Sequence, residues 1–106
     1  MNERAIYQVD AFTDRLFGGN PAAVVPLPAW PEDALLQAVA AENNLAETAY
    51  VVAEGAGYRI RWFTPEVEVN LCGHATLAAA WVVFRYLQPE RRRVEFLSRS
   101  GPLTVT

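Results

Sequence analysis

The chain has 106 residues, of which 52% are hydrophobic and 20% are charged, and this composition predicts one globular domain with an apolar core. All nine cationic residues are arginine, and the chain contains one cysteine, one histidine and two serines. The lack of lysine excludes Schiff-base chemistry, and one His with one Cys cannot build a four-ligand zinc site. No G-x-S-x-G turn surrounds either serine, which excludes a serine triad. A net charge of −3 argues against a nucleic-acid partner.

The N-terminal ten residues predict no targeting segment. They carry Glu3 and Asp10 and lack the apolar stretch of a signal peptide. A single cysteine agrees with a reducing compartment. We therefore expect a cytoplasmic protein.

Two-residue alternation of apolar and polar side chains predicts β-strands along most of the chain. In chain order, these strands span residues 5–12, 22–27, 48–53, 58–63, 67–71, 93–97 and 103–106. Pro31 and the two acids after it suit the first turn of a helix that Asn43-Asn44 would end. Residues 54–57 are expected to form a hairpin turn, and residues 100–102 another turn. Up to residue 71, we expect mostly antiparallel strands with one solvated face.

The segment from His74 to Leu87 breaks this alternation, because its apolar residues cover every side of a helical wheel. A helix that is apolar on all sides is buried or spans a membrane, and this segment is shorter than the ~20 residues needed to span one. The simplest packing curls the strands around it. The sequence therefore predicts an α+β fold, a mostly antiparallel sheet or barrel wrapped around a central buried helix, without membrane contact.

The sole cysteine and the sole histidine lie two residues apart, in Cys72-Gly73-His74, where a strand meets that helix. The first turn of a helix has unpaired N–H groups and the positive end of the dipole, so it can bind a carboxylate. Gly73 would let a ligand approach the backbone. The dipole would favour a thiolate on Cys72, and either Cys72 or His74 could move protons. The alternative is that Cys72 is a small buried hydrophobe and His74 a satisfied cap.

Three other polar features are weak on local evidence alone. Glu47 lies at a helix-strand junction, where a glutamate is usually a surface charge. Asn20 is in a Gly-Gly-Asn-Pro turn, where Asn is more often a turn former than a ligand. The run Arg91-Arg92-Arg93 is interpreted as a solvated turn ahead of the next strand.

Five motifs in order closely resemble the phenazine-biosynthesis PhzF-like isomerases. They are Asp10-Ala11-Phe12, Phe17-Gly18-Gly19-Asn20-Pro21-Ala22-Ala23-Val24-Val25, Asn44-Leu45-Ala46-Glu47-Thr48, Arg61-Trp62-Phe63-Thr64-Pro65 and Leu71-Cys72-Gly73-His74-Ala75-Thr76-Leu77-Ala78. The resemblance implies a diaminopimelate-epimerase-like fold, in which two lobes, each a β-barrel around a helix, enclose the active site. It covers essentially the whole chain but only the N-terminal lobe of the family. Residues 1–106 are therefore expected to be a single lobe, with the second lobe absent.

The resemblance also implies roles for individual residues. Glu47 would be the general acid/base, assisted by His74, and would shift a proton on a small carboxylic acid without cofactor or metal. Asn20, Cys72, Gly73 and His74 would contact the substrate, for which a dihydro-hydroxyanthranilate is an example. The second lobe and a homodimer would be the protein partners. Ala46 replaces a common Ser, and Asn70 a common Asp, but neither touches the proposed base.

Two alternatives remain beside this interpretation. Cys72 could be the base of a two-cysteine racemase or epimerase, since Cys-Gly-His also resembles that signature. The chain could also be a non-catalytic lobe that binds or dimerises, because its apolar excess includes Trp30, Trp62 and Trp81. A carboxylate that removes a proton from carbon needs desolvation, which a cleft between two lobes supplies. We therefore expect the chain alone to be inactive.

Overall fold

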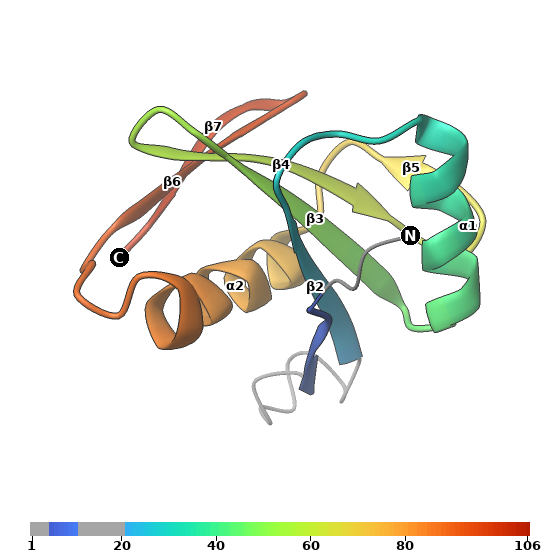
Figure 1. Ribbon diagram of the computed structural model, residues 1–106, viewed down its shortest axis with the longest axis horizontal. Helices are drawn as coiled ribbons and strands as arrows, with labels where there is room; N and C mark the ends of the chain where they lie inside the picture. Colours follow the sequence, from blue (N-terminus) through green and yellow to red (C-terminus); the bar gives the residue numbers. More distant parts are fainter. Residues whose placement is uncertain (1–4, 11–20) are drawn as a thin grey trace.

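A mixed β-sheet and two helices form the fold in the computed structural model, which describes residues 5–10 and 21–106 (Figure 1). The strands are β1 (Tyr7–Asp10), β2 (Pro21–Leu27), β3 (Glu47–Glu54), β4 (Gly57–Phe63), β5 (Glu68–Val69), β6 (Val94–Ser98) and β7 (Gly101–Val105). The helical elements are α1 (Asp33–Asn43), α2 (Gly73–Val82) and the π-helical segment η2 (Val83–Leu87). The described strands follow the spatial order β1-β2-β3-β4-β6-β7, and β5 pairs with β4.

Most strand pairings are antiparallel, as the sequence predicts. The exceptions among the described strands are β2 with β3 and β4 with β6, which are parallel. β4 pairs with β5 near its C-terminal end, where Trp62 faces Val69, and with β6 near its start, where Tyr58 faces Phe96. The chain leaves β5 directly for α2, so the start of α2 lies at the β5 end of the sheet.

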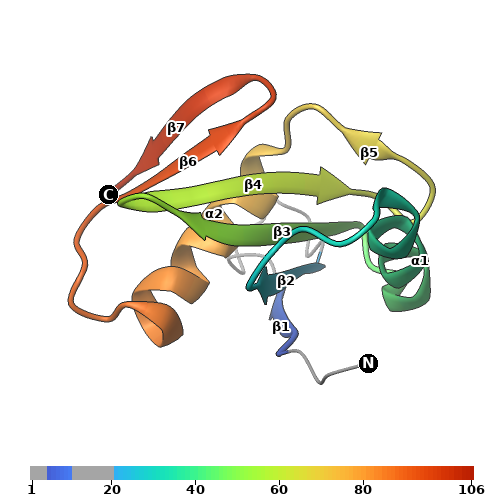
Figure 2. The same ribbon diagram turned by 45° about the horizontal axis from the view of Figure 1, so that its top comes forward.

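The predicted wrapping of the sheet around a helix is confirmed. Each of the seven described strands contributes a buried or partly buried side chain to one cluster with α2, from Val9 in β1 to Val105 in β7. Figure 2 shows β3 and β4 crossing in front of α2, with the β6–β7 hairpin above them. Because side chains alternate along a strand, Ala49 and Val51 of β3 join this cluster, whereas Tyr50 faces the other way.

The other face of the sheet is not simply solvated, contrary to the expectation. α1 covers part of it, with Leu36 and Ala40 packed against Val25, Tyr50 and Phe63 in a second cluster. The phenol of Tyr50 donates a 2.7 Å hydrogen bond to the carbonyl oxygen of Leu36. α1 ends as predicted, because Asn44 follows it in the left-handed conformation, with φ of 52°.

The prediction that α2 is buried on all sides is wrong. Leu77, Trp81 and Tyr86 are 40%, 42% and 50% exposed along α2 and η2. The side that packs against the sheet is made of smaller residues. These are Ala75, Thr76, Ala78, Ala79, Ala80, Val82 and Val83. Small side chains let the helix approach the strands closely, and the large residues are left on the outer side.

The predicted strand over residues 67–71 is also too long. Only β5 pairs, and Val67 and Leu71 are more than half exposed. Thr64 explains the late start of the strand. Its hydroxyl accepts hydrogen bonds from the backbone N–H groups of Glu66 and Val67, and its own N–H donates to the Val67 carbonyl. This turn keeps Val67 out of the sheet, so β5 begins only at Glu68.

The remaining turns follow the prediction closely. Residues 54–57 form a hairpin turn, and the last turn falls at residues 99–100, slightly earlier than expected. Arg92 and Arg93 are exposed in the turn before β6. None of the helices in the described ranges has the length and apolar character needed to cross a membrane.

Candidate active site

Glu47 is the first residue of β3 and follows the turn that ends α1. The left-handed Asn44 redirects the chain, and the Asn43 side chain donates a 3.3 Å hydrogen bond to the hydroxyl of Thr48, which is fully buried. These contacts fix the backbone on both sides of Glu47. Its side chain is only 18% exposed, so the local interpretation of Glu47 as an ordinary surface charge is wrong.

Cys72 and His74 lie at the N-terminus of α2. Cys72 is the N-cap residue, in an extended conformation, and its carbonyl oxygen accepts hydrogen bonds from both the N–H and the hydroxyl of Thr76, at 3.0 and 2.7 Å. The first-turn amides of such a helix have no acceptor within the helix and can serve a ligand. Gly73 is exposed, and a Cβ added to it would meet no described atom within 4 Å.

The structure brings the side chains of Glu47, Cys72 and His74 together. Oε1 of Glu47 lies 3.2 Å from Nε2 of His74, and Sγ of Cys72 lies 3.7 Å from Nδ1 of the same ring. One polar atom from each of the three residues lies within 4.8 Å of the other two. Gly73 borders this cluster, whereas Asn20 lies outside the described residues. The cluster combines a carboxylate, an imidazole and a thiol beside Gly73, where the described residues leave space, and this combination suits proton transfer.

The expectation of a thiolate at Cys72 is not supported. Burial raises the pKa of the Cys72 thiol, and the charge and hydrogen bond of Glu47 raise it further. The backbone N–H groups of Ala75 and His74 lower this pKa, but they do not outweigh the other effects. Desolvation and a neighbouring carboxylate therefore favour the protonated thiol over the anion.

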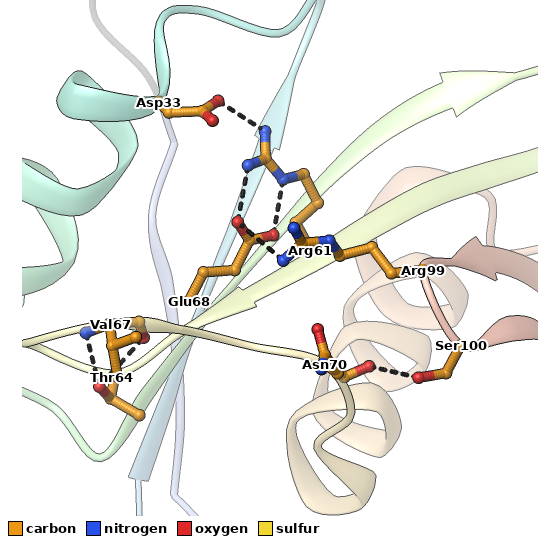
Figure 3. Close-up of polar contacts among 8 residues, drawn as sticks. All are labelled: Asp33, Arg61, Thr64, Val67, Glu68, Asn70, Arg99 and Ser100. Atoms are coloured by element: carbon orange, nitrogen blue, oxygen red, sulfur yellow. Dashed lines mark hydrogen bonds and ion pairs between the residues drawn. The ribbon is translucent and has the colours of Figure 1, made fainter.

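Sequence reasoning missed a polar network that holds the chain before Cys72 (Figure 3). Arg61 donates two 2.8 Å hydrogen bonds to Glu68 and one 3.0 Å hydrogen bond to Asp33 at the start of α1. Arg99 lies 3.3 Å from the same Glu68 carboxylate. The alternation along β4 predicts that Arg61 faces outward, but nothing in the sequence identifies its partners.

A further hydrogen bond of this region lies closer to Glu47, Cys72 and His74. The hydroxyl of Ser100, in the β6–β7 turn, donates a 2.8 Å hydrogen bond to the carbonyl oxygen of Asn70 (Figure 3). Asn70 is two residues before Cys72. Hydrogen bonds to Glu68 and Asn70 therefore tie the segment that leads into α2 to β4 and to the β6–β7 turn.

A sheet wrapped around a helix, with Glu47, Cys72 and His74 gathered at the start of that helix, is an epimerase-like fold. Residues 9–106 match the family model described as phenazine biosynthesis-like protein. The chain belongs to this family, as its motifs indicate.

Two curated relatives from Pseudomonas aeruginosa, both named as uncharacterized isomerases, are 61% and 59% identical to the chain over 99 and 103 residues. These alignments cover 93% and 97% of the chain but only 38% and 40% of the relatives. The crystal structure of a PhzF-family protein from Enterococcus faecalis superposes with a TM-score of 0.90 at 53% identity, covering 97% of the chain and 40% of that protein. The chain thus spans about two fifths of the length of these proteins.

Proposed function

We propose that this chain is the acid/base lobe of a PhzF-type isomerase, in which Glu47 moves a proton between two carbons of a small carboxylic acid. The observation that carries the proposal is the 3.2 Å contact between Glu47 and His74 at the N-terminus of α2. The names of the relatives support the reaction class. The helix N-terminus supports a carboxylate ligand, because its amides and dipole favour an anion.

The chemistry needs only the described groups. The Glu47 carboxylate takes a proton from carbon, the electron pair of the broken C–H bond enters the unsaturated system of the substrate, and the Glu47 carboxyl group returns the proton to another carbon. The contact with His74 fixes the carboxylate, and the α2 amides would stabilise charge on the substrate carboxylate. A dihydro-hydroxyanthranilate is a substrate of this class.

Glu47 is a better candidate base than Cys72, because the thiol is held protonated by burial and by Glu47 itself. The test compares Glu47→Gln with Cys72→Ser in the full product of the gene, with Glu54→Gln at the other end of β3 as a control. We measure turnover and deuterium incorporation from D₂O. Glu47→Gln should lower the rate by about 10²- to 10⁴-fold, and the other two variants should retain activity. Loss of activity in Cys72→Ser with a functional Glu47→Gln would favour the racemase alternative.

The site as described borders open space at Gly73, and a second lobe would close it. We therefore propose that the 106-residue chain alone is inactive and that its protein partner is a second lobe of the same enzyme. Assays of the purified chain, with and without a separately produced lobe from one of the longer relatives, test this. Turnover by the chain alone would contradict the proposal.

An exposed aromatic surface favours a second candidate role, association through the outer side of α2. Tyr7 stacks on Tyr86 with ring centroids 4.7 Å apart, and Trp81 meets Tyr86 at 5.8 Å. Trp81 and Tyr86 remain close to half exposed, and exposed apolar patches often mark interfaces. Sedimentation and apolar-dye binding test this role. A monomer that binds no dye would argue against it.

A further inference from the structure

The side-chain set at the candidate active site has a second chemical capacity, metal binding. Carboxylate, thiolate and imidazole are the three groups that proteins use to hold Zn²⁺. We propose that Glu47, Cys72 and His74 bind one Zn²⁺ ion as a three-ligand site with an open fourth position. This site lies within the 106-residue chain and requires no second lobe.

The distance between Cys72 and His74 fits this ion. Zn–S and Zn–N bonds of about 2.3 and 2.0 Å in a tetrahedral site place the two ligand atoms roughly 3.5 Å apart. Sγ of Cys72 and Nδ1 of His74 are 3.7 Å apart, so a metal can bind both with little movement. Their i, i+2 spacing around Gly73 places both side chains at the start of α2.

Glu47 would supply the third ligand once its carboxylate moves toward the metal. One polar atom of each residue lies within 4.8 Å of the others, whereas two oxygen or nitrogen ligands of a tetrahedral zinc are about 3.3 Å apart. Its carboxylate faces Nε2 of His74, while Cys72 faces Nδ1. A metal on Nδ1 would therefore draw the carboxylate away from Nε2 and end the 3.2 Å contact.

The proposed site is accessible to a Zn²⁺ ion, and its ligands balance the charge of the ion. Gly73 is exposed with no described atom near the position of a Cβ, which leaves an entry path beside the ligands. Binding replaces the proton of the Cys72 thiol, which goes to solvent, so the bound ion faces a thiolate and a carboxylate. A site with three protein ligands keeps its fourth position for water.

The consequence for activity rests on the proposed function. A carboxylate that coordinates Zn²⁺ cannot remove a proton from carbon, so Zn²⁺ would inhibit the isomerase. The binding itself does not depend on that function, because it follows from the ligand set alone.

The test titrates the purified 106-residue chain with Zn²⁺ alone, by calorimetry, and with Co²⁺ as a spectroscopic probe. We expect one ion per chain and a thiolate-to-cobalt charge-transfer band. Cys72→Ser should abolish the band. Cys72→Ser, His74→Asn and Glu47→Gln should each weaken Zn²⁺ binding by more than the roughly 10- to 100-fold that loss of an outer-shell partner costs. Glu54→Gln, on the same strand but outside the cluster, should bind like the parent chain.

Circular dichroism identifies any variant that fails to fold, and the three ligand variants provide independent tests. Undiminished Zn²⁺ affinity in a folded Cys72→Ser, His74→Asn or Glu47→Gln variant would overturn the three-ligand proposal, as would the absence of binding to the parent chain. Because no substrate is present, either result would leave the isomerase proposal intact. Conversely, Zn²⁺ binding by the parent chain, together with full isomerase activity of the Glu47→Gln variant, would remove the isomerase proposal and keep the metal site.

Discussion

The carboxylate of Glu47 and the imidazole of His74 lie 3.2 Å apart, although they come from the start of β3 and the start of α2. This contact joins the two junctions at which the sequence changes from helix to strand and from strand to helix. It also places the carboxylate beside the helix N-terminus, where backbone amides favour bound anions. The side chains of Glu47, Cys72 and His74 thus meet at one end of the sheet.

The first prediction concerns the reactivity of Cys72. Burial and the Glu47 carboxylate raise the pKa of its thiol, so the parent chain should react slowly with iodoacetamide near neutral pH. Glu47→Gln removes the negative charge, which lowers this pKa and shifts the pH profile of alkylation to lower pH. The rate at pH 7 to 8 should rise about three- to tenfold. Mass spectrometry of the single cysteine measures it.

Glu54→Gln is the matched control for this experiment, because Glu54 lies at the far end of β3 in an exposed ion pair with Arg59. Its alkylation profile should coincide with that of the parent chain. Identical profiles for all three proteins would mean that Glu47 does not influence the thiol.

The fold could be predicted to the extent that periodicity determines it. Alternation along β4 separates Ile60 and Trp62 from Arg61, and the apolar character of α2 correctly indicated that the sheet packs against it. The same alternation failed at Val67, because the Thr64 turn holds its backbone groups outside the sheet, and at Leu71, which follows the end of β5. The exposed Arg85, four residues after Trp81 and 6.0 Å from its ring centre, is a polar residue on the outer side of this helical segment. The large apolar side chains of Leu77 and Trp81 on the same side nevertheless led the sequence pattern to predict burial there.

Local sequence patterns indicated only part of the candidate site. Cys72 and His74 are neighbours in the chain, so their spacing before a helix is a local signal. Glu47 is brought to them by tertiary packing, and only the resemblance to a family identified it. The contacts of Arg61 with Asp33 and Glu68 are equally non-local, which is why no pattern indicated them.

A second prediction addresses the network behind the site. Arg61 is only 18% exposed and makes three hydrogen bonds to Glu68 and Asp33 (Figure 3), and its guanidinium also lies 5.4 Å from the ring centre of Trp30. Arg61→Lys keeps the charge but loses the planar fork. It should lower the free energy of unfolding by about 2 kcal/mol, between the values for surface and buried ion pairs.

Arg59→Lys is the control for that substitution, since Arg59 lies two residues earlier on the same strand and pairs with Glu54 in an exposed ion pair. Urea unfolding should show a change of less than about 0.5 kcal/mol for Arg59→Lys. Equal losses in the two variants would show that the Glu68 and Asp33 contacts contribute nothing specific.

A third prediction distinguishes two glycines. A Cβ at Gly73 would meet no atom of residues 5–10 and 21–106 within 4 Å, whereas a Cβ at Gly57 would collide with the backbone carbonyl oxygen of Glu95. Gly57→Ala should therefore destabilise the chain by about 1–3 kcal/mol, and Gly73→Ala should leave its thermal melting unchanged. In the full gene product, Gly73→Ala should still lower kcat/KM by roughly 10²-fold if substrate approaches this backbone. Unchanged kinetics would remove Gly73 from the substrate-binding residues.

The last prediction concerns alkaline stability and tests the packing of α1. Burial raises the pKa of Tyr50 to about 12, and its phenol donates a 2.7 Å hydrogen bond to Leu36. The folded chain thus holds this proton more tightly than the unfolded chain, whose tyrosines titrate near 10. The contribution is complete below about pH 10 and is lost as the pH rises toward 12. Urea unfolding at a series of pH values should show a decline of about 2 kcal/mol in the free energy of unfolding over this interval.

The Tyr50→Phe variant should be about 1 kcal/mol less stable at neutral pH, because it lacks the hydrogen bond, and its stability should decline clearly less at alkaline pH. An equally steep decline in Tyr50→Phe would assign the alkaline transition to other groups.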